Sequence, residues 1–410
     1  MRNLIKIAVR NLFRYKRRTL LTSSLIAFGV ILVIVFGGLA ISFKTQMVGV
    51  ITNSSLGDLQ FHKQGYVESI DNLPLNLTLS GDRLAAVEKS LQQNPNVAAY
   101  SPRLKFGAMI SNYAQTSNLR LSAVYPEHEN PTCPDLVKRI QSELPNPNQF
   151  LKPGEILVPQ NLMKGLELKV GDEIVLVATN KDGSVNGIPL RIGAVIESVL
   201  GPAGKDGYIH IDDAKTLLRM EELEIIEIAV RLKQFDQLKN VFGELKKEIA
   251  APTSGIEVHT WEQLSPFASI ARIVDLLIIV VKFILISIVL VSILNIMTMS
   301  VYERISEIGT IAAIGTRPSR ILSLFLIEGF AMGLLSTVAG IVIGLGLLWL
   351  MNLTPINFTF GMMQVSLAPS IPPREVVLVT VIVMLVSVLA SLQPAYKAAK
   401  MEPVEALGHV

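Results

Sequence analysis

Apolar residues along the chain are gathered into four long runs that hold few or no charges. A helix needs about 20 predominantly apolar residues to cross the hydrocarbon core of a bilayer, so each run predicts a membrane-spanning helix. A long polar segment follows the first run, whereas short segments separate the others. The runs extend from Leu20 to Phe43, from Leu276 to Met299, from Ile321 to Leu350 and from Val376 to Leu392.

The long segment, residues 44–272, mixes helix-like and strand-like patterns. Apolar residues recur every three or four positions in Asp82–Gln93 and Gln234–Ile249, which predicts two amphipathic helices. Each is flanked by predicted strands, and two such β-α-β units can pair into one ferredoxin-like sheet, with a mostly β subdomain inserted over residues 130–200. The predicted strands are Asp58–His62, Val97–Ile110, Leu119–Val124, Glu155–Val158, Glu173–Ala178, Pro189–Val199, Tyr208–Ile211, Ile225–Leu232 and Ile256–Thr260.

Charge orients these segments relative to the membrane. Basic residues and no acidic ones precede the first run, and basic residues favour the cytoplasmic side. Residues 44–272 hold 23 basic and 27 acidic residues, a net charge of −4, so the total of +3 leaves +7 for the rest. We therefore expect both termini in the cytoplasm and residues 44–272 outside. A cleavable signal peptide is the competing interpretation of the N-terminus, although the apolar run is longer than a usual signal core.

The predicted fold class is a multi-pass α-helical membrane protein with one plus three spans and a large extracytoplasmic α+β domain. The predicted divisions are a cytoplasmic amphipathic helix (1–19), the first span (20–43), the outward domain (44–272), the second span (273–299), a cytoplasmic loop (300–320), the third span (321–350), an outward loop (351–375), the fourth span (376–393) and a cytoplasmic tail (394–410).

Composition and motifs argue against several classes of protein. Half of the residues are hydrophobic and 17% are charged, against roughly 25% charged in soluble domains, which disfavours a soluble enzyme. The net charge is too small to indicate a nucleic-acid binder. The single cysteine, Cys133, and the absence of a GxxxxGK[ST] phosphate loop leave no predicted catalytic residue, metal ligand or bound cofactor. His128 lies between Glu127 and Glu129, which we expect to form a solvated acidic loop.

Ionisable residues within the predicted spans need a partner or a route to water. Asp275 and Lys282 lie two helical turns apart, and we expect Lys282 to extend toward the outer surface, with a proton or ion relay as the alternative. Glu328 lies in the third span. The same span carries two GxxxG pairs, which suit packing among the four spans or a dimer face; they are Gly329, Gly333, Gly340 and Gly344.

The loop between the second and third spans predicts a short helix on the membrane surface. Glu303, Arg304 and Glu307 are expected on its charged side and Ile308 on its apolar side. Pro318 suits the first turn of the next helix, where its missing N–H is harmless.

Two motifs in this order resemble the FtsX-like, or MacB-like, family of ABC transporter permeases. The first, ER-x-x-EIG-x-x-x-A-x-G followed by I-x-x-x-F-x-x-E, is matched by Glu303, Arg304, Glu307, Ile308, Gly309, Ala313, Gly315, Ile321, Phe325 and Glu328. The second, P-A-x-x-A-A-x-x-x-P-x-E-A-L, is matched by Pro394, Ala395, Ala398, Ala399, Pro403, Glu405, Ala406 and Leu407.

The resemblance implies a non-catalytic subunit of the inner membrane. It implies that the helix near Tyr302–Gly315 couples to a separate ATPase, which binds ATP and magnesium, and that a second permease copy or paralogue completes a dimer embedded in lipid. ATP-driven motion would then be transmitted to the outward domain. The segments Gly57–Tyr66 and Gly154–Val177 look similar to the lipoprotein-releasing branch, whose cargo passes to a periplasmic carrier. Efflux through an adaptor and signalling to a cell-wall hydrolase remain alternatives.

Overall fold

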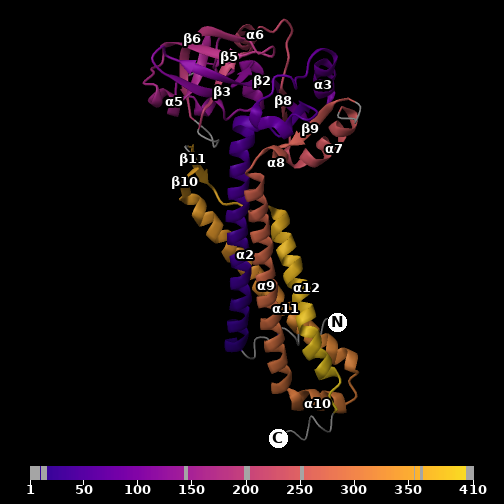
Figure 1. The fold of residues 1–410 in the computed structure, drawn as a ribbon. Helices are drawn as coiled ribbons and strands as arrows, with labels where there is room; N and C mark the ends of the chain where they lie inside the picture. The colour runs from indigo at the N-terminus through magenta and orange to yellow at the C-terminus, as the bar shows by residue number, and fades with distance from the viewer. Residues whose placement is uncertain are drawn as a thin grey trace. The chain divides into compact units, whose positions relative to one another are not determined.

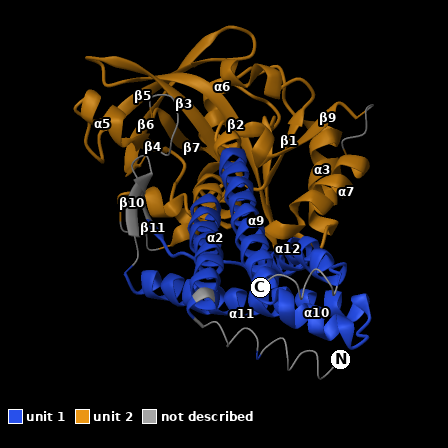
Figure 2. Cartoon of the chain, turned by 90° about the horizontal axis from the view of Figure 1, so that it is seen from below, with its two compact units in different colours: residues 1–45, 271–357, 366–410 blue, residues 46–270, 358–365 orange. Residues whose placement is uncertain are grey.

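The computed structural model describes residues 10, 16–142, 146–197, 204–249, 254–354, 356–360 and 363–402. The chain divides into two compact units, shown in different colours in Figure 2. Unit 1 contains residues 1–45, 271–357 and 366–410, and unit 2 contains residues 46–270 and 358–365.

Long helices build unit 1 (Figure 1), and four of the described helices are long and apolar enough to cross a membrane. They are α2 (Lys16–Ile51), α9 (Ala268–Glu303), α11 (Pro318–Leu353) and α12 (Pro373–Ala399). Each contains one predicted span and extends beyond it. The 36 residues of α2 or α9 correspond to about 54 Å of helix, well beyond the ~30 Å of a hydrocarbon core.

Shorter elements connect these helices. α10 (Ile305–Ala313) lies between α9 and α11, and Pro318 begins α11, as its missing N–H predicted. Between α11 and α12, where we predicted a loop, the chain forms a hairpin of β10 (Ile356–Phe360) and β11 (Met363–Leu367).

An apolar core holds the helices of unit 1 together. Ile26, Val30 and Ile34 of α2 are fully buried in one cluster with residues of the other helices, including Val289 and Phe325. Large apolar side chains on the outer faces are exposed instead, as a membrane-facing surface requires. Examples are Phe28, Phe283, Val342 and Trp349.

Unit 2 contains the predicted ferredoxin-like sheet. Its strands follow the order β2-β8-β1-β9, all antiparallel, with α3 and α7 as the helices of the two β-α-β units. The elements are β1 (Leu59–Lys63), α3 (Gly81–Gln93), β2 (Val97–Ser111), β8 (Glu227–Leu232), α7 (Leu238–Glu248) and β9 (Ile256–Thr260). The prediction of two paired β-α-β units is confirmed.

The remaining strands of unit 2 close into a barrel. The order β3-β7-β4-β6-β5-β2 returns on itself because β2 also pairs with β3. Each described strand of this ring is therefore paired on both sides. The elements are β3 (Thr116–Val124), α4 (Pro126–Thr132), β4 (Glu155–Pro159), α5 (Gln160–Gly165), β5 (Glu173–Thr179), β6 (Val185–Ile196), β7 (Asp206–His210) and α6 (Ile211–Leu218).

The inserted subdomain contains more of the chain than the predicted residues 130–200. The first half of β2 pairs with β8 in the ferredoxin-like sheet, whereas Leu104–Ser111 pairs with β3 in the barrel. One long strand therefore belongs to both parts, and its apolar pattern continues without a signal where the partner changes. All nine predicted strands of unit 2 are present, and α4 and α6 were not predicted.

Candidate coupling site

A sharp corner at the end of α9 positions the candidate coupling helix. α9 ends at Glu303, and Arg304 departs from helical geometry with φ −115° and ψ 20° before α10 begins at Ile305. At the other end Gly315 adopts φ 91°, a conformation that favours glycine, and its N–H donates to the carbonyl oxygen of Ala312 at 3.0 Å. Figure 1 shows α10 at the same end of unit 1 as the C-terminal end of α9.

A buried ion pair fixes this corner to α11. Arg304 Nη1 donates to Glu328 Oε1 at 3.0 Å, and the side chains are only 5% and 2% exposed. We predicted Arg304 on the charged side of the surface helix, but it points into the helix bundle instead, since the break at Arg304 turns its side chain inward. The pair joins residues from the two halves of the first motif. Removing either partner would strand a charge in the protein interior.

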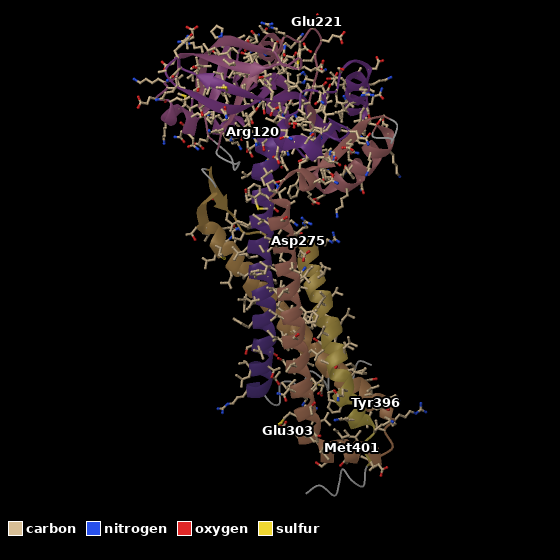
Figure 3. All side chains as sticks on the ribbon, viewed as in Figure 1. Arg120, Glu221, Asp275, Glu303, Tyr396 and Met401 are labelled. Carbon is tan, nitrogen blue, oxygen red and sulfur yellow. The ribbon has the colours of Figure 1, made fainter. Side chains whose placement is uncertain are left out.

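The exposed side of the corner is both acidic and apolar. Glu303 and Glu307 are exposed, whereas Ile308 and Gly309 face the interior. Ala313 and Gly315 are also exposed. Large apolar side chains lie on the same segment, with Tyr302 61% exposed, Ile311 43% and Ile314 81%. Figure 3 labels Glu303 at the opposite end of α9 from Asp275. Apolar anchors ringed by charge are the composition of a protein-docking surface.

The glycines of α11 lie against helices of the same unit. A Cβ added to Gly329 would sit 2.6 Å from Ser391 Cβ, and one added to Gly333 would sit 2.7 Å from Ser387 Cβ, both on α12. A Cβ on Gly340 would sit 2.7 Å from Val30 Cβ on α2. Gly344 likewise approaches Ile34 of α2, at 3.0 Å. The two GxxxG pairs therefore allow close packing inside unit 1, one pair against each neighbour.

The other ionisable residues of the spans are paired between helices. Asp275 on α9 accepts from Lys44 Nζ of α2 at 2.7 Å. Lys282 on α9 donates to Glu375 Oε2 of α12 at 2.6 Å. We expected Lys282 to extend toward the outer surface, and the structure pairs it with a carboxylate at the start of α12, a partner that the sequence did not identify. Asp275 and Lys282 thus tie α9 to two different helices.

Only part of the second motif lies among the residues that the structure describes. Pro394, Ala395 and Ala398 are buried in α12, which continues to Ala399 beyond the predicted end of the fourth span at residue 393. These small residues let α12 stay packed at the coupling end. Pro403, Glu405, Ala406 and Leu407 lie outside the described residues, as does most of the predicted N-terminal amphipathic helix.

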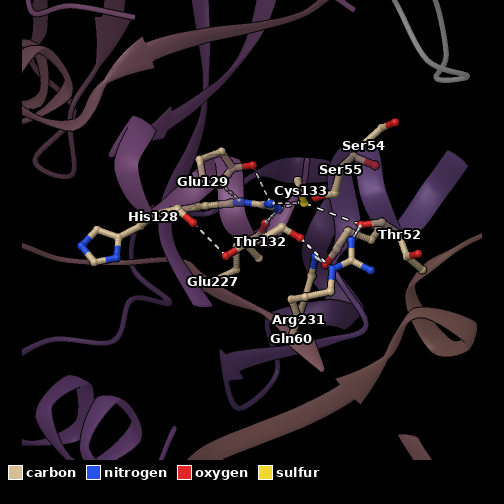
Figure 4. A network of polar contacts seen from close by, with 12 residues as sticks. Thr52, Ser54, Ser55, Gln60, His128, Glu129, Thr132, Cys133, Glu227 and Arg231 are labelled. Atoms are coloured by element: carbon tan, nitrogen blue, oxygen red, sulfur yellow. Dashed lines mark hydrogen bonds and ion pairs between the residues drawn. The ribbon is translucent and has the colours of Figure 1, made fainter. Parts of the chain in front are cut away.

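A buried polar network in unit 2 corrects our reading of the acidic segment at Glu127–Glu129 (Figure 4). This segment forms α4, and Glu129 is fully buried. Its two carboxylate oxygens accept from Arg103 Nε at 2.8 Å and Nη2 at 2.7 Å. Arg103 Nη1 also donates to Glu227 Oε1 at 3.0 Å, and Lys105 Nζ lies 2.9 Å from the same oxygen.

These contacts perturb the ionisation of the network. Burial acts to raise the pKa of Glu227, but Lys105 and Arg103 outweigh it and hold that pKa well below its usual range. Burial raises the pKa of the Cys133 thiol to about 11, even though Arg103 Nη2 donates to its sulfur at 3.0 Å. The thiol therefore stays protonated at neutral pH, which suits a structural rather than a reactive cysteine.

Sequence reasoning missed these pairings because each joins residues that are distant along the chain. Arg103 and Lys105 lie within a predicted strand that is mostly apolar, and this was the available signal that a buried charge needed a partner. Nothing in the spacing identified that partner as Glu129 or Glu227. The same holds for Arg304 and Glu328, whose residue types are part of one motif.

Comparison with known proteins places the chain in a family. Residues 19–248 match the MacB-like periplasmic core domain, and residues 279–403 match the FtsX-like permease C-terminal family. The lipoprotein-releasing system transmembrane protein LolE of Haemophilus influenzae is 25% identical over 343 residues, which cover 78% of this chain and 80% of that protein. LolC of Neisseria meningitidis serogroup B, from the same type of system, is 21% identical over 408 residues, covering 95% and 93%.

Solved structures that are similar to part of this chain include a periplasmic region. The periplasmic region of MacB from Actinobacillus actinomycetemcomitans covers 54% of this chain and 95% of its own, with 10% identity and a TM-score of 0.36. The MacB-like match covers the first spanning helix and most of unit 2, whereas the FtsX-like match covers most of the other three spanning helices and the first motif. The chain belongs to the family of FtsX-like ABC transporter permeases with a MacB-like periplasmic core domain.

Proposed function

We propose that this permease couples ATP hydrolysis on a separate ATPase to work done by its outward domain. The observation that carries the proposal is the buried Arg304–Glu328 pair, which fastens the base of α10 to α11 while the outer face of α10 stays exposed. A force applied to that face is passed to a spanning helix rather than absorbed by a loose loop. The ATPase would bind ATP and magnesium, and this chain would bind neither.

The proposed orientation follows from charge. The end of unit 1 that carries α10 faces the cytoplasm, both termini lie there, and unit 2 lies outside the inner membrane. A second copy of the permease, or a paralogue, completes the transporter within the lipid.

The proposed cargo is a lipoprotein or another lipid-anchored molecule. The support is that the two relatives compared above are named as parts of lipoprotein-releasing systems and align over most of this chain. A periplasmic carrier would receive such cargo once it left the outer leaflet.

Charge reversal on α10 tests the coupling. The change is Glu303→Lys with Glu307→Lys, and the matched control is Glu221→Lys with Glu222→Lys, two exposed acidic residues of unit 2. Both variants alter net charge equally, but only the first alters the exposed side of α10. We expect the first to lose the co-purifying ATPase or its stimulation by at least about tenfold, and the control to keep both. Wild-type binding and stimulation in the first variant would refute the coupling assignment.

Mass spectrometry of the complex, purified from native membranes in mild detergent, tests the cargo. Co-purification of an ATPase together with lipid-modified peptides supports lipoprotein release. An ATPase with an adaptor or a cell-wall hydrolase would replace the cargo part of the proposal. Recovery without an ATPase would refute the coupling itself.

A further inference from the structure

A row of ionisable side chains crosses the ferredoxin-like sheet of unit 2 from strand to strand. Arg103 of β2 lies opposite Glu227 of β8. Glu227 lies opposite His62 of β1, and His62 lies opposite Glu257 of β9. Directly opposite residues of antiparallel strands point to the same face of the sheet, so these four side chains are successive neighbours. Histidine ordinarily changes its charge between about pH 5 and pH 8, so only at His62 does the sign of the row depend on mild changes of pH.

His62 is buried without a hydrogen-bond partner. Its side chain is fully buried, and among the described residues neither ring nitrogen has a partner. Glu227 Oε2 also has none, and it lies 3.8 Å from His62 Nε2, which is too far for a hydrogen bond. The other oxygen of Glu227 is occupied by Arg103 and Lys105 (Figure 4 shows Glu227 in its network). A possible donor and a free acceptor therefore face each other across one missing contact.

Neighbouring groups restrict the ring of His62. Tyr66 stacks on it with ring centroids 5.1 Å apart and 15° between the planes, and the centroid of the His259 ring lies 5.5 Å away. Tyr66 reaches this place because the chain turns back directly after β1, where Gly65 adopts φ 83°. The N–H of Gly65 donates to Glu257 Oε2 at 3.4 Å. A charge gained on the ring must therefore be compensated by the side chains already in the row.

The charges near His62 favour the uptake of one proton. The row and its buried partners hold two positive and three negative side chains, a net charge of −1 while His62 is neutral; they are Arg103, Lys105, Glu129, Glu227 and Glu257. One proton on His62 makes this group neutral. Two more cations face the adjoining rings, Lys246 near His259 and Arg120 near Tyr66. Both are exposed, so water and salt screen them.

A second proton on the neighbouring ring is disfavoured. Burial and the nearby His62 lower the pKa of His259. His259 Nε2 also lies 3.8 Å from Glu257 Oε2, so the two rings compete for the same partly exposed carboxylate. The two histidines therefore share one favourable proton, and the register assigns it to His62, which alone lies between two carboxylates.

We propose that His62 is a pH-dependent link within the outward domain, whose protonated ring joins β8, β1 and β9 by bonding to Glu227 and Glu257. The strand that gains most is β9, because it is the last strand of the sheet and pairs only with β1 among the described strands. Acid surroundings would tighten this edge of the domain, and neutral surroundings would loosen it. The link requires neither the ATPase nor the cargo of the proposed function.

His62→Gln tests the link, because glutamine keeps a donor and an acceptor but cannot take up a charge. Glu257→Gln removes one carboxylate at a partly exposed position and decides the question if the buried substitution prevents folding. The control is His128→Gln, which removes an exposed histidine of α4 in the same unit. Amide hydrogen exchange of the full chain in detergent is measured at about pH 8 and about pH 5.5. Each variant is compared with wild type at the same pH, so that the intrinsic pH dependence of exchange cancels.

We expect the protection of β9 in wild type, relative to His62→Gln, to rise about tenfold between the two pH values, because charge-assisted hydrogen bonds form only with the protonated ring. The lowered pKa of His259 acts in the opposite direction, since the unfolded chain binds that proton more readily, but His259 is present in both proteins.

The ratio of wild type to Glu257→Gln should rise in the same way, whereas the ratio of wild type to His128→Gln should stay constant. A ratio to His62→Gln or to Glu257→Gln that stays constant or falls in acid overturns the link. An equal rise relative to His128→Gln also overturns it, because the effect would then not belong to His62.

Discussion

Replacement of Gly333 by alanine perturbs a close approach between α11 and α12. The added Cβ would sit 2.7 Å from Ser387 Cβ, whereas carbon atoms in ordinary contact lie about 3.5–4.0 Å apart. The helices must therefore separate locally by roughly 0.8 Å, because a Cβ atom cannot rotate away from its own backbone. Overpacking of this kind costs about 1–3 kcal/mol of stability.

The matched control is Gly346→Ala on the same helix, where a Cβ meets nothing within 4 Å. Both substitutions share the gain in helix propensity of about 1 kcal/mol, so the difference between them isolates the clash. Ser387→Gly in the Gly333→Ala background removes both obstructing atoms, since Ser387 supplies the Cβ and the Oγ nearest to the new methyl group. We expect the double variant to recover most of the lost stability.

Thermal unfolding of the purified chain in one detergent is the assay, with the three variants and wild type measured together. The expected order of stability places Gly333→Ala lowest and Gly346→Ala at or above wild type. Equal stability of these two variants would refute the packing argument. So would a double variant that is no more stable than Gly333→Ala, because coupling between touching residues should be measurable.

Three further changes test the charged pairs. Glu328→Ala should lower stability by about 3–5 kcal/mol by leaving Arg304 buried without a counter-ion, and adding Arg304→Met should restore much of it; an additive loss in thermal unfolding would contradict this. Because the pKa of Glu227 is lower in the folded protein than its ordinary 4.5, its stabilising effect is present above that pH and is lost as the pH falls below it. The stability advantage of wild type over Glu227→Gln should therefore shrink between about pH 6 and pH 3, and a constant difference would refute the assignment. Lys44→Met, at the partly exposed pair with Asp275, should cost less than about 1 kcal/mol, and a larger shift in unfolding would show that the pair is more than a surface contact.

Local sequence patterns predicted the helices and strands of this protein more completely than they predicted which of these elements pair with one another. The four apolar runs and the nine strands of unit 2 were visible, because each depends on the periodicity of neighbouring residues. The ferredoxin-like order also followed, since two β-α-β units have few ways to pair. The closure of the barrel did not follow, because the strand β2 changes partner midway while its own apolar pattern continues.

For the candidate site, too, the positions of elements were predicted but the contacts between distant residues were not. The position of α10 and the glycines of α11 were evident from the motif and the spacing. The inward direction of Arg304 was not, because local spacing shows neither the break in the helix at that residue nor its contact with Glu328. The burial of Glu129 was missed for the same reason, since short polar segments resemble loops until a distant arginine is known to meet them.

The shared strand β2 has an evolutionary consequence. The chain leaves the ferredoxin-like sheet after Arg103 and returns to it at Glu227, and these residues face each other in the register of β2 and β8. Cross-strand neighbours can be joined by a two-residue turn, so the whole barrel lies between two adjacent points of a smaller domain. The barrel is therefore an insertion into the ferredoxin-like sheet. During evolution such an insertion can be lengthened, reshaped or lost while the sheet keeps its fold.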